Sequence, residues 1–196
     1  MPRPFHHTTI LMLWLFVAGV ASVLAQTGTL WLDRPLTPWN KPAASLPSPA
    51  QKPAAAAALA KRCSLNASAA ASAATAVTAA GWIPYLHQDR TLAREGVEVI
   101  AGLPEANAAC EAVGFNLFVF VTGRFAGTLS PVPMTTGSDG VAGAVRIVNA
   151  DSLTAEFARF VPGDLECCPS TRVRVTYRID RGEQPTVVAT GVQVLR

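Results

Sequence analysis

The clearest alternation of apolar and polar residues lies between residues 172 and 180. Positions 173, 175, 177 and 179 hold Val, Val, Tyr and Ile, and polar residues stand between them. Successive side chains of a strand point to opposite faces, so this pattern predicts a strand with one buried and one wet face. Three arginines, Arg172, Arg174 and Arg178, share the wet face.

Further strand patterns precede and follow this segment. Phe115 to Val121 is a dense apolar run, and Thr122-Gly123 turns the chain into a second hairpin arm. Gly137-Ser138-Asp139-Gly140 has turn chemistry, because Gly and Asp tolerate positive φ. The remaining predicted strands span residues 96–101, 124–129, 141–148, 153–161 and 186–195.

Sequence patterns that favour helix occur only before the main series of predicted strands. The Ala-rich stretch predicts a helix within residues 67–79, and Pro104 to Val113 has helix-forming residues behind a first-turn proline. Strands in hairpin succession behind one or two helices predict an α+β fold, with a mostly antiparallel sheet covered on one face by helix. A small β-barrel or sandwich is the alternative.

The N-terminus predicts export. Ile10 to Ala25 carries no charge and ends in residues that a signal peptidase tolerates before a cut at Gln26, so residues 1–25 are interpreted as a signal peptide. An uncleaved anchor is the alternative, although the run is shorter than the roughly 20 residues of a spanning helix. No cysteine follows Ala25 as the acceptor of a bacterial lipoprotein.

Residues 26–58 have the composition of a disordered linker, because prolines recur among Ala, Ser, Lys and Gln with few large apolar groups. A proline-rich ligand segment anchored by Trp31 and Trp39 is the alternative. Residues 59–196 then form a single exported domain, whose length suits one hydrophobic core.

The four cysteines are Cys63, Cys110, Cys167 and Cys168. An exported chain meets an oxidising compartment, so two disulfides are expected. A bond between the adjacent cysteines needs a strained ring and is the least favoured of the three pairings. The other two tie Cys63 and Cys110 separately to the Cys-Cys corner, and the sequence leaves both open. Either bridge from Cys110 would stabilise the folded protein by about 4 kcal/mol, because closing the loop restricts the unfolded chain.

Charge and spacing exclude several ligand classes. The net charge is only +3 and the basic residues are scattered, so no nucleic-acid partner is expected. Cysteine spacing of the zinc type is missing, so no metal and no cofactor is predicted. A membrane partner is expected only if the N-terminal segment is retained.

Catalytic patterns are weak. His87 is the sole histidine beyond the signal segment, and it stands near Asp89. No elbow motif frames Ser64 or Ser170 as a nucleophile. We therefore expect a protein that is not an enzyme, with a secreted hydrolase assembled around His87 as the alternative. The candidate ligand contacts are Trp82, Tyr85, Arg172, Arg174 and Arg178.

Two strings support a family resemblance. One is FNLFVFVTGRFAGTLSP at residues 115–131, and the other runs from Phe157-Ala158-Arg159-Phe160 through Gly163-Asp164-Leu165-Glu166-Cys167-Cys168-Pro169-Ser170. Over roughly residues 80–182 the chain resembles the LppP/LprE family of exported bacterial proteins. The resemblance implies an uncharacterised protein, typically a lipoprotein of the cell envelope, and it transfers no catalytic residue.

These observations predict an exported, disulfide-stabilised, non-enzymatic protein that binds an envelope protein or a cell-wall component. The expected location is the periplasm, the cell envelope or the extracellular space.

Overall fold

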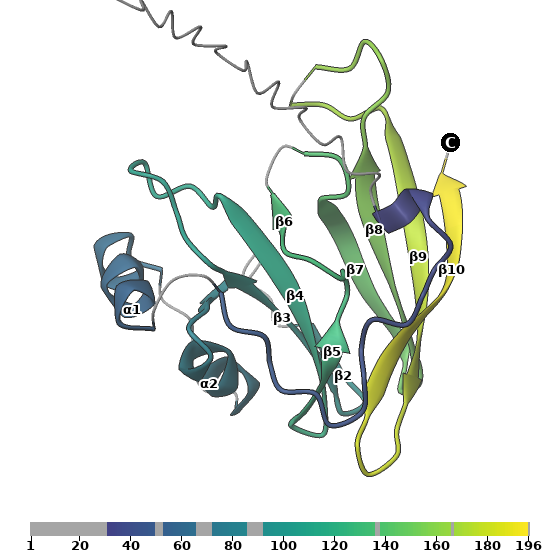
Figure 1. Ribbon diagram of the computed structural model, residues 1–196, viewed down its shortest axis with the longest axis horizontal. Helices are drawn as coiled ribbons and strands as arrows, with labels where there is room; N and C mark the ends of the chain where they lie inside the picture. Colours follow the sequence, from purple (N-terminus) through teal and green to yellow (C-terminus); the bar gives the residue numbers. More distant parts are fainter. Residues whose placement is uncertain are drawn as a thin grey trace, which may run out of the picture.

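The computed structural model describes residues 31–49, 53–65, 72–85, 92–135, 138–165 and 167–195. The predicted signal peptide lies outside these residues. Two antiparallel sheets pack face to face, and two helices lie on the far side of one of them (Figure 1). The α+β prediction is confirmed, and the strands form two open sheets rather than one sheet closed on itself. The helices, the face-to-face sheets and the chain between them belong to one packed unit.

The first sheet is built around β3 and β4, which carry its most apolar sequences. Its strand order is β1-β3-β4-β5, while β2 pairs with β3 and β6 pairs with β4. The strands are β1 (Ile83–Tyr85), β2 (Leu92–Arg94), β3 (Val97–Leu103), β4 (Gly114–Val121), β5 (Arg124–Thr128) and β6 (Met134–Thr135).

The second sheet contains the strand whose alternation is clearest in the sequence. Its order is β10-β9-β8-β7, so each strand pairs with the next one along the chain. These strands are β7 (Ala142–Asn149), β8 (Ser152–Arg159), β9 (Thr171–Asp180) and β10 (Thr186–Leu195). All the longer strands predicted from residue 96 onwards are present.

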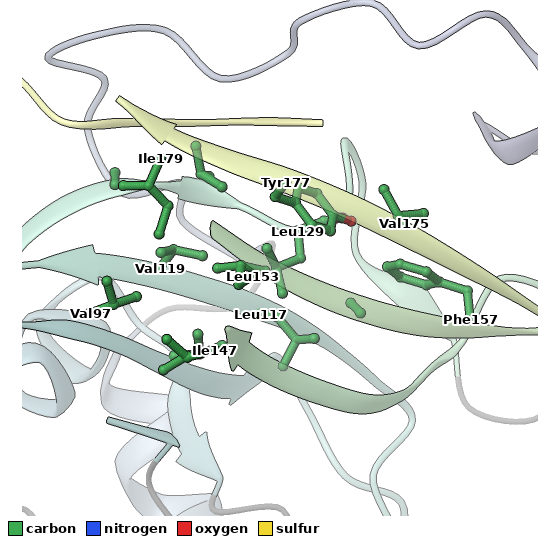
Figure 2. Close-up of a cluster of buried hydrophobic side chains, with 14 of the residues drawn as sticks. Val97, Leu117, Val119, Leu129, Ile147, Leu153, Phe157, Val175, Tyr177 and Ile179 are labelled. Atoms are coloured by element: carbon green, nitrogen blue, oxygen red, sulfur yellow. The ribbon is translucent and has the colours of Figure 1, made fainter. Parts of the chain in front are cut away.

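The main core lies between the two sheets (Figure 2). Val119 of the first sheet and Leu153, Phe157, Val175 and Tyr177 of the second are fully buried there. The Tyr177 hydroxyl donates a hydrogen bond to the Leu129 carbonyl, which satisfies both groups inside the core. Burial raises the pKa of this phenol well above its usual value.

The outer face of the first sheet is covered by α2 (Ser72–Ala79), which contacts β1 and β3. Ala73 and Val77 are fully buried against Phe118 of β4, and this confirms a helix within the predicted range. Gly81 lies just beyond the end of the helix, and its positive φ lets the Trp82 N–H reach the Val77 carbonyl at 3.1 Å.

The predicted helix over residues 104–113 is wrong. The segment is a turn in which Ala106 and Ala112 form an isolated bridge. The Asn107 side chain bonds the backbone N–H of Glu111 and the Glu111 carboxylate, and Cys110 has a φ of 63°. Local hydrogen bonds from the asparagine side chain compete with the backbone bonds of a helix. The helix-forming composition of this segment is therefore not sufficient to make it helical.

The expected linker is ordered over residues 31–49, which we call the strap. It begins with a short 3₁₀ helix, η1 (Trp31–Asp33), whose Leu32 is buried in the main core. The Trp31 ring contacts Phe157 edge-on at 5.1 Å, and the Trp39 ring lies 6.5 Å from that of Tyr177. Disorder is therefore wrong for this part of residues 26–58, because the few large apolar groups among the prolines pack into the domain.

Asn40 fixes the strap where the two sheets meet. Its amide donates to the carbonyls of Thr128 in β5, at 2.9 Å, and Val187 in β10, at 3.0 Å. Its side-chain oxygen accepts the Thr128 N–H at 2.9 Å. Gly127 has a φ of 137°, and a Cβ at this position would collide with the Asn40 amide.

The residues that follow Asn40 lead toward the helices. The Pro47 carbonyl accepts a 2.6 Å hydrogen bond from the Trp82 indole, so the strap reaches the opposite side of the first sheet. Beyond it, α1 (Pro53–Arg62) starts inside the range expected to be linker. The ordered chain thus includes residues well before the predicted domain boundary at residue 59.

The disulfide pairing differs from both favoured pairings. Cys63 bonds Cys110, with Cα atoms 5.4 Å apart, and Cys167 bonds Cys168. Cys63 follows α1, beside the first sheet, and Arg62 donates to the Asn107 carbonyl at 3.4 Å. The Cys-Cys corner instead lies in the loop between β8 and β9 of the second sheet. The bond between adjacent cysteines, least favoured from sequence, is therefore the one formed.

Helices long and apolar enough to cross a membrane do not occur among the described residues.

Candidate functional site

Polar residues gather on the outer face of the second sheet. Arg172, Arg174 and Arg178 alternate along β9 with residues that are buried in the core, as the sequence pattern predicts. Register places Glu156 of β8 opposite Arg174, so both side chains stand on this face. The three predicted arginines are thus brought together on one surface, which we call the arginine face.

Carboxylates pair with each of the three arginines. Glu156 lies between two of them, at 2.7 Å from Arg174 and 3.8 Å from Arg172. Arg178 pairs with Asp180 on its own strand at 3.1 Å. Such solvent-exposed pairs contribute little to stability, typically about 0–1 kcal/mol. Their main effect here is to hold the guanidinium groups in defined positions.

A shallow hollow of about 310 Å³ opens on the arginine face. Arg146 of β7 stands opposite Thr154 of β8, and together with Arg174 and Glu156 they give the hollow a polar lining with a net charge of +1. The described residues offer Arg146 no ion pair. The lining residues are Ala144, Arg146, Val148, Thr154, Glu156 and Arg174.

Sequence reasoning missed Arg146. Register shifts interrupt β7 between Ala142 and Val145 and again between Ile147 and Asn149. Such bulges break the two-residue period by which outward-facing side chains are recognised. The signal that remained was the single charge in an otherwise apolar strand.

Trp82 is not a ligand contact, contrary to the prediction. Its side chain is 1% exposed, and its ring packs edge-on against Phe118 at 5.0 Å. The indole N–H is already bonded to Pro47. Tyr85 is the last residue of β1 and its side chain is not among those described, so its predicted role stays a prediction.

The residues of the hydrolase alternative are not brought together in the described part of the chain. His87 and Asp89 lie outside the described residues. The Ser170 hydroxyl donates to the Asp164 carboxylate at 3.2 Å, an arrangement that closes a loop. Ser64 follows α1 with a φ of 50°. The alternative around His87 therefore stays a prediction.

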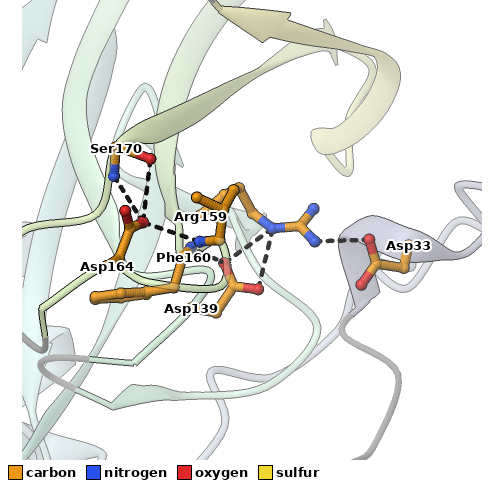
Figure 3. A network of polar contacts seen from close by, with 7 residues as sticks. Asp33, Asp139, Arg159, Phe160, Asp164 and Ser170 are labelled. Atoms are coloured by element: carbon orange, nitrogen blue, oxygen red, sulfur yellow. Dashed lines mark hydrogen bonds and ion pairs between the residues drawn. The ribbon is translucent and has the colours of Figure 1, made fainter.

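Asp164 organises the loop between β8 and β9. Its carboxylate accepts the backbone N–H groups of Val161 and Ser170, each at 2.9 Å (Figure 3). Hydrogen bonds from Ser170, and then from Val161, hold the pKa of Asp164 below its usual value because they favour the charged form. One carboxylate thus holds the backbone at Val161 and at Ser170, on the two sides of the Cys-Cys corner.

A second carboxylate pair fixes the end of β8. Arg159 bonds Asp139 at 2.8 Å and Asp33 of η1 at 2.7 Å (Figure 3). Asp139 also accepts the Phe160 N–H at 3.3 Å. This network joins the strap, the turn before β7 and the β8–β9 loop at one end of the molecule.

Among the described residues, clusters of three metal-ligating side chains do not occur. Besides Asp164 and Tyr177, Glu98 of β3 has a shifted pKa, which partial burial raises. These three groups stand on different elements, and Asp164 and Tyr177 bond the backbone. The arginine face is the arrangement best suited to bind a ligand.

One family model matches the chain, over residues 99–182, and its description is LppP/LprE lipoprotein. No curated protein matches the chain, and no solved structure does. The matched segment runs from β3 to the end of β9 and includes both strings on which the resemblance rests. A lipoprotein family implies an exported, envelope-associated protein. The resemblance is confirmed, and residues 99–182 of this chain are similar to the LppP/LprE lipoproteins.

Proposed function

We propose that this protein is a non-enzymatic envelope protein that binds an anionic group of a cell-wall component or of another envelope protein through the arginine face. The family match supports export and association with the envelope. The anion preference is supported by the chemistry of the hollow between β7, β8 and β9.

The observation that carries the proposal is Arg146. Its guanidinium lines a hollow and forms no ion pair with the described residues. A guanidinium presents five N–H donors in a planar fork that matches carboxylate and phosphate oxygens. An anion in the hollow would give Arg146 an ion-pair partner that the described residues do not provide.

Glu156 and Arg174 support the same preference. Glu156 is 18% exposed at its side chain and holds Arg174 at 2.7 Å, so the second guanidinium is already positioned. Pre-positioning reduces the entropy lost on binding. Ala144 and Val148 add apolar lining beside these charges, which suits a ligand with a carbon skeleton as well as an anionic group.

Cosedimentation with insoluble cell-wall material of the producing bacterium tests the proposal. Arg146→Gln and Arg174→Gln should each lower the retained fraction of the exported protein about tenfold, since hydrogen bonds to charged groups contribute about 1.5–3 kcal/mol. Binding should also weaken as salt rises.

Arg94→Gln is the matched control, because it removes an equal charge from an exposed side chain on the other sheet. It should leave retention unchanged. Equal losses in all three variants would mean that only overall charge matters, and unchanged retention of Arg146→Gln would reject the arginine face.

A further inference from the structure

Exposed apolar side chains collect at one end of the second sheet. Leu165 is 71% exposed, Val194 59%, Val192 43% and Val161 42%. We call these four residues the apolar tip. Scattered exposed apolar residues are ordinary, but several on one end of a molecule indicate a contact surface.

Strand register places the tip residues together. Val194 is paired with Val173, near the start of β9, and β9 begins directly after the loop that holds Val161 and Leu165. Figure 1 shows this β8–β9 loop at the same end of the sheet as the end of β10 and η1. The four side chains thus share one end of the sheet.

Two of the valines come from the core side of the sheet. Val192 and Val194 are opposite Val175 and Val173, which are buried. Side chains directly opposite one another share a face, so these valines extend the core face beyond the part that is covered. Val192 and Val194 therefore belong to the part of the core face that no other element covers among the described residues.

The loop part of the tip is held in position. Asp164 joins Val161 and Ser170 through three hydrogen bonds, and Cys167 is bonded to Cys168. The Cys168 N–H also donates to the Leu165 carbonyl at 2.9 Å. Leu165 is consequently presented to solvent by a fixed loop, which reduces the ordering cost of any contact it makes.

The chain enters the domain at this same end. η1 is tied to the end of β8 by the Asp33–Arg159 pair, and Trp31 packs on Phe157. Five residues, 26–30, separate Trp31 from the uncharged run Ile10 to Ala25. Five residues span at most about 18 Å. When the apolar run lies in a bilayer, the tip is therefore brought close to the lipid.

Arg172 adds a charge of the appropriate sign. It is the first outward-facing arginine of β9, and its side chain is 69% exposed. It is paired with Leu195, beside the tip. Basic side chains near a bilayer are attracted to anionic lipids by about 1 kcal/mol each. An apolar surface flanked by a guanidinium matches the boundary between headgroups and acyl chains.

We propose that the N-terminal apolar run is retained as an anchor, the alternative to cleavage, and that the apolar tip rests on the membrane surface beside the point where this run enters the bilayer. This contact is independent of the proposed anion binding, because the hollow lies on the side of the second sheet and the tip lies at its end. The orientation leaves the hollow lined by Arg146 and Arg174 away from the lipid and accessible to an envelope ligand.

Photolabelling from within the lipid tests this orientation. The full chain is studied in membrane vesicles of the producing cells with a lipid-soluble photoactivatable probe, and tryptic peptides are analysed by mass spectrometry. Peptides 160–172 and 182–196, which contain the tip, should be labelled. Peptide 147–159, which carries the exposed Val148 of β7, should not be.

Variants give the matched comparison. Leu165→Ser with Val194→Ser should lower the labelling of both tip peptides to the level of peptide 147–159, whereas Val148→Ser should leave the labelling of the tip peptides unchanged. An unlabelled tip would overturn the proposal, as expected if a second copy of the chain or another protein covers it. Equal labelling of all three peptides would overturn it as well.

Discussion

At the scale of single residues, Asn40 links the two sheets through its side chain. One side chain satisfies three backbone groups on two sheets. Asn40→Ala should lower the free energy of unfolding by about 3 kcal/mol, because leaving partly buried backbone groups unpaired costs about 1–3 kcal/mol each. Urea denaturation of the exported protein measures this. Gln193→Ala, at an exposed amide on β10, is the control and should change stability little.

The same contact can be tested from the glycine opposite. Gly127→Ala places a Cβ where the Asn40 amide lies and forces a non-glycine residue to a φ of 137°. We expect a loss of stability of about 2 kcal/mol or more, since strained backbone conformations cost about 1–3 kcal/mol before any clash is counted. Gly182→Ala has open space around its Cβ and should be nearly neutral. Equal effects of the two substitutions would contradict this assignment.

Asp164 makes closure of the β8–β9 loop dependent on pH. Its pKa is lowered in the folded protein, so its charged form favours the closed loop. That contribution is present above the ordinary aspartate pKa and is lost as the pH falls through the lowered value. The protection of the Val161 and Ser170 amides against hydrogen exchange, taken relative to the intrinsic rate at each pH, should therefore fall only in acid, and Asp164→Ala should remove this pH response. Retained protection of both amides in the alanine variant would contradict the role.

At the scale of elements, the two disulfides should differ greatly in their effect on stability. Cys63–Cys110 joins residues 47 apart in sequence, whereas Cys167–Cys168 joins neighbours. Closing the longer loop restricts the unfolded chain by about 4 kcal/mol, and a bond between neighbours restricts it hardly at all. Replacing the first pair by serine should lower the thermal midpoint strongly, and replacing the second pair should lower it slightly. The reverse order would reject the pairing.

The elements that were predicted correctly are those whose local pattern agrees with their environment. β9 alternates because its two faces meet core and water, and β4 is apolar because both of its faces are covered. The turn at 104–113 and the disulfide pairing depend on contacts between distant segments, and a local pattern does not contain these. The strap left a weak signal, namely two tryptophans and a leucine among prolines.

The candidate site was predicted in part for the same reason. The regular period of β9 placed Arg172 and Arg174 on an outer face, and the structure adds the acidic partner Glu156. Arg146 was missed because bulges obscure the period of β7. Trp82 was misassigned because an aromatic residue at the start of a domain can equally be core, and only packing distinguishes the two.

At the scale of the whole molecule, the strap connects the parts that the two proposals use. It starts beside the apolar tip, passes the meeting point of β5 and β10 at Asn40, and reaches Trp82 under α2 (Figure 1). The domain therefore follows the N-terminal apolar run almost at once. A tip held at the lipid and an arginine face on the side of the same sheet then have a fixed relation to the membrane.

This view predicts where the folding unit begins. A chain of residues 26–196 keeps the strap, while residues 50–196 keep α1 but lose Leu32, both strap tryptophans and Asn40. The shorter chain should be less stable by about 5 kcal/mol or more, since burial of one leucine contributes about 1.5–3 kcal/mol and the unpaired groups around Asn40 add a similar amount. Denaturation of both chains measures the difference. A peptide of residues 26–49 added in trans should restore part of the loss, because the strap's site on the sheets is still present. Equal stability of the two chains would mean that the strap is only a spacer and that the domain begins at the boundary indicated by composition.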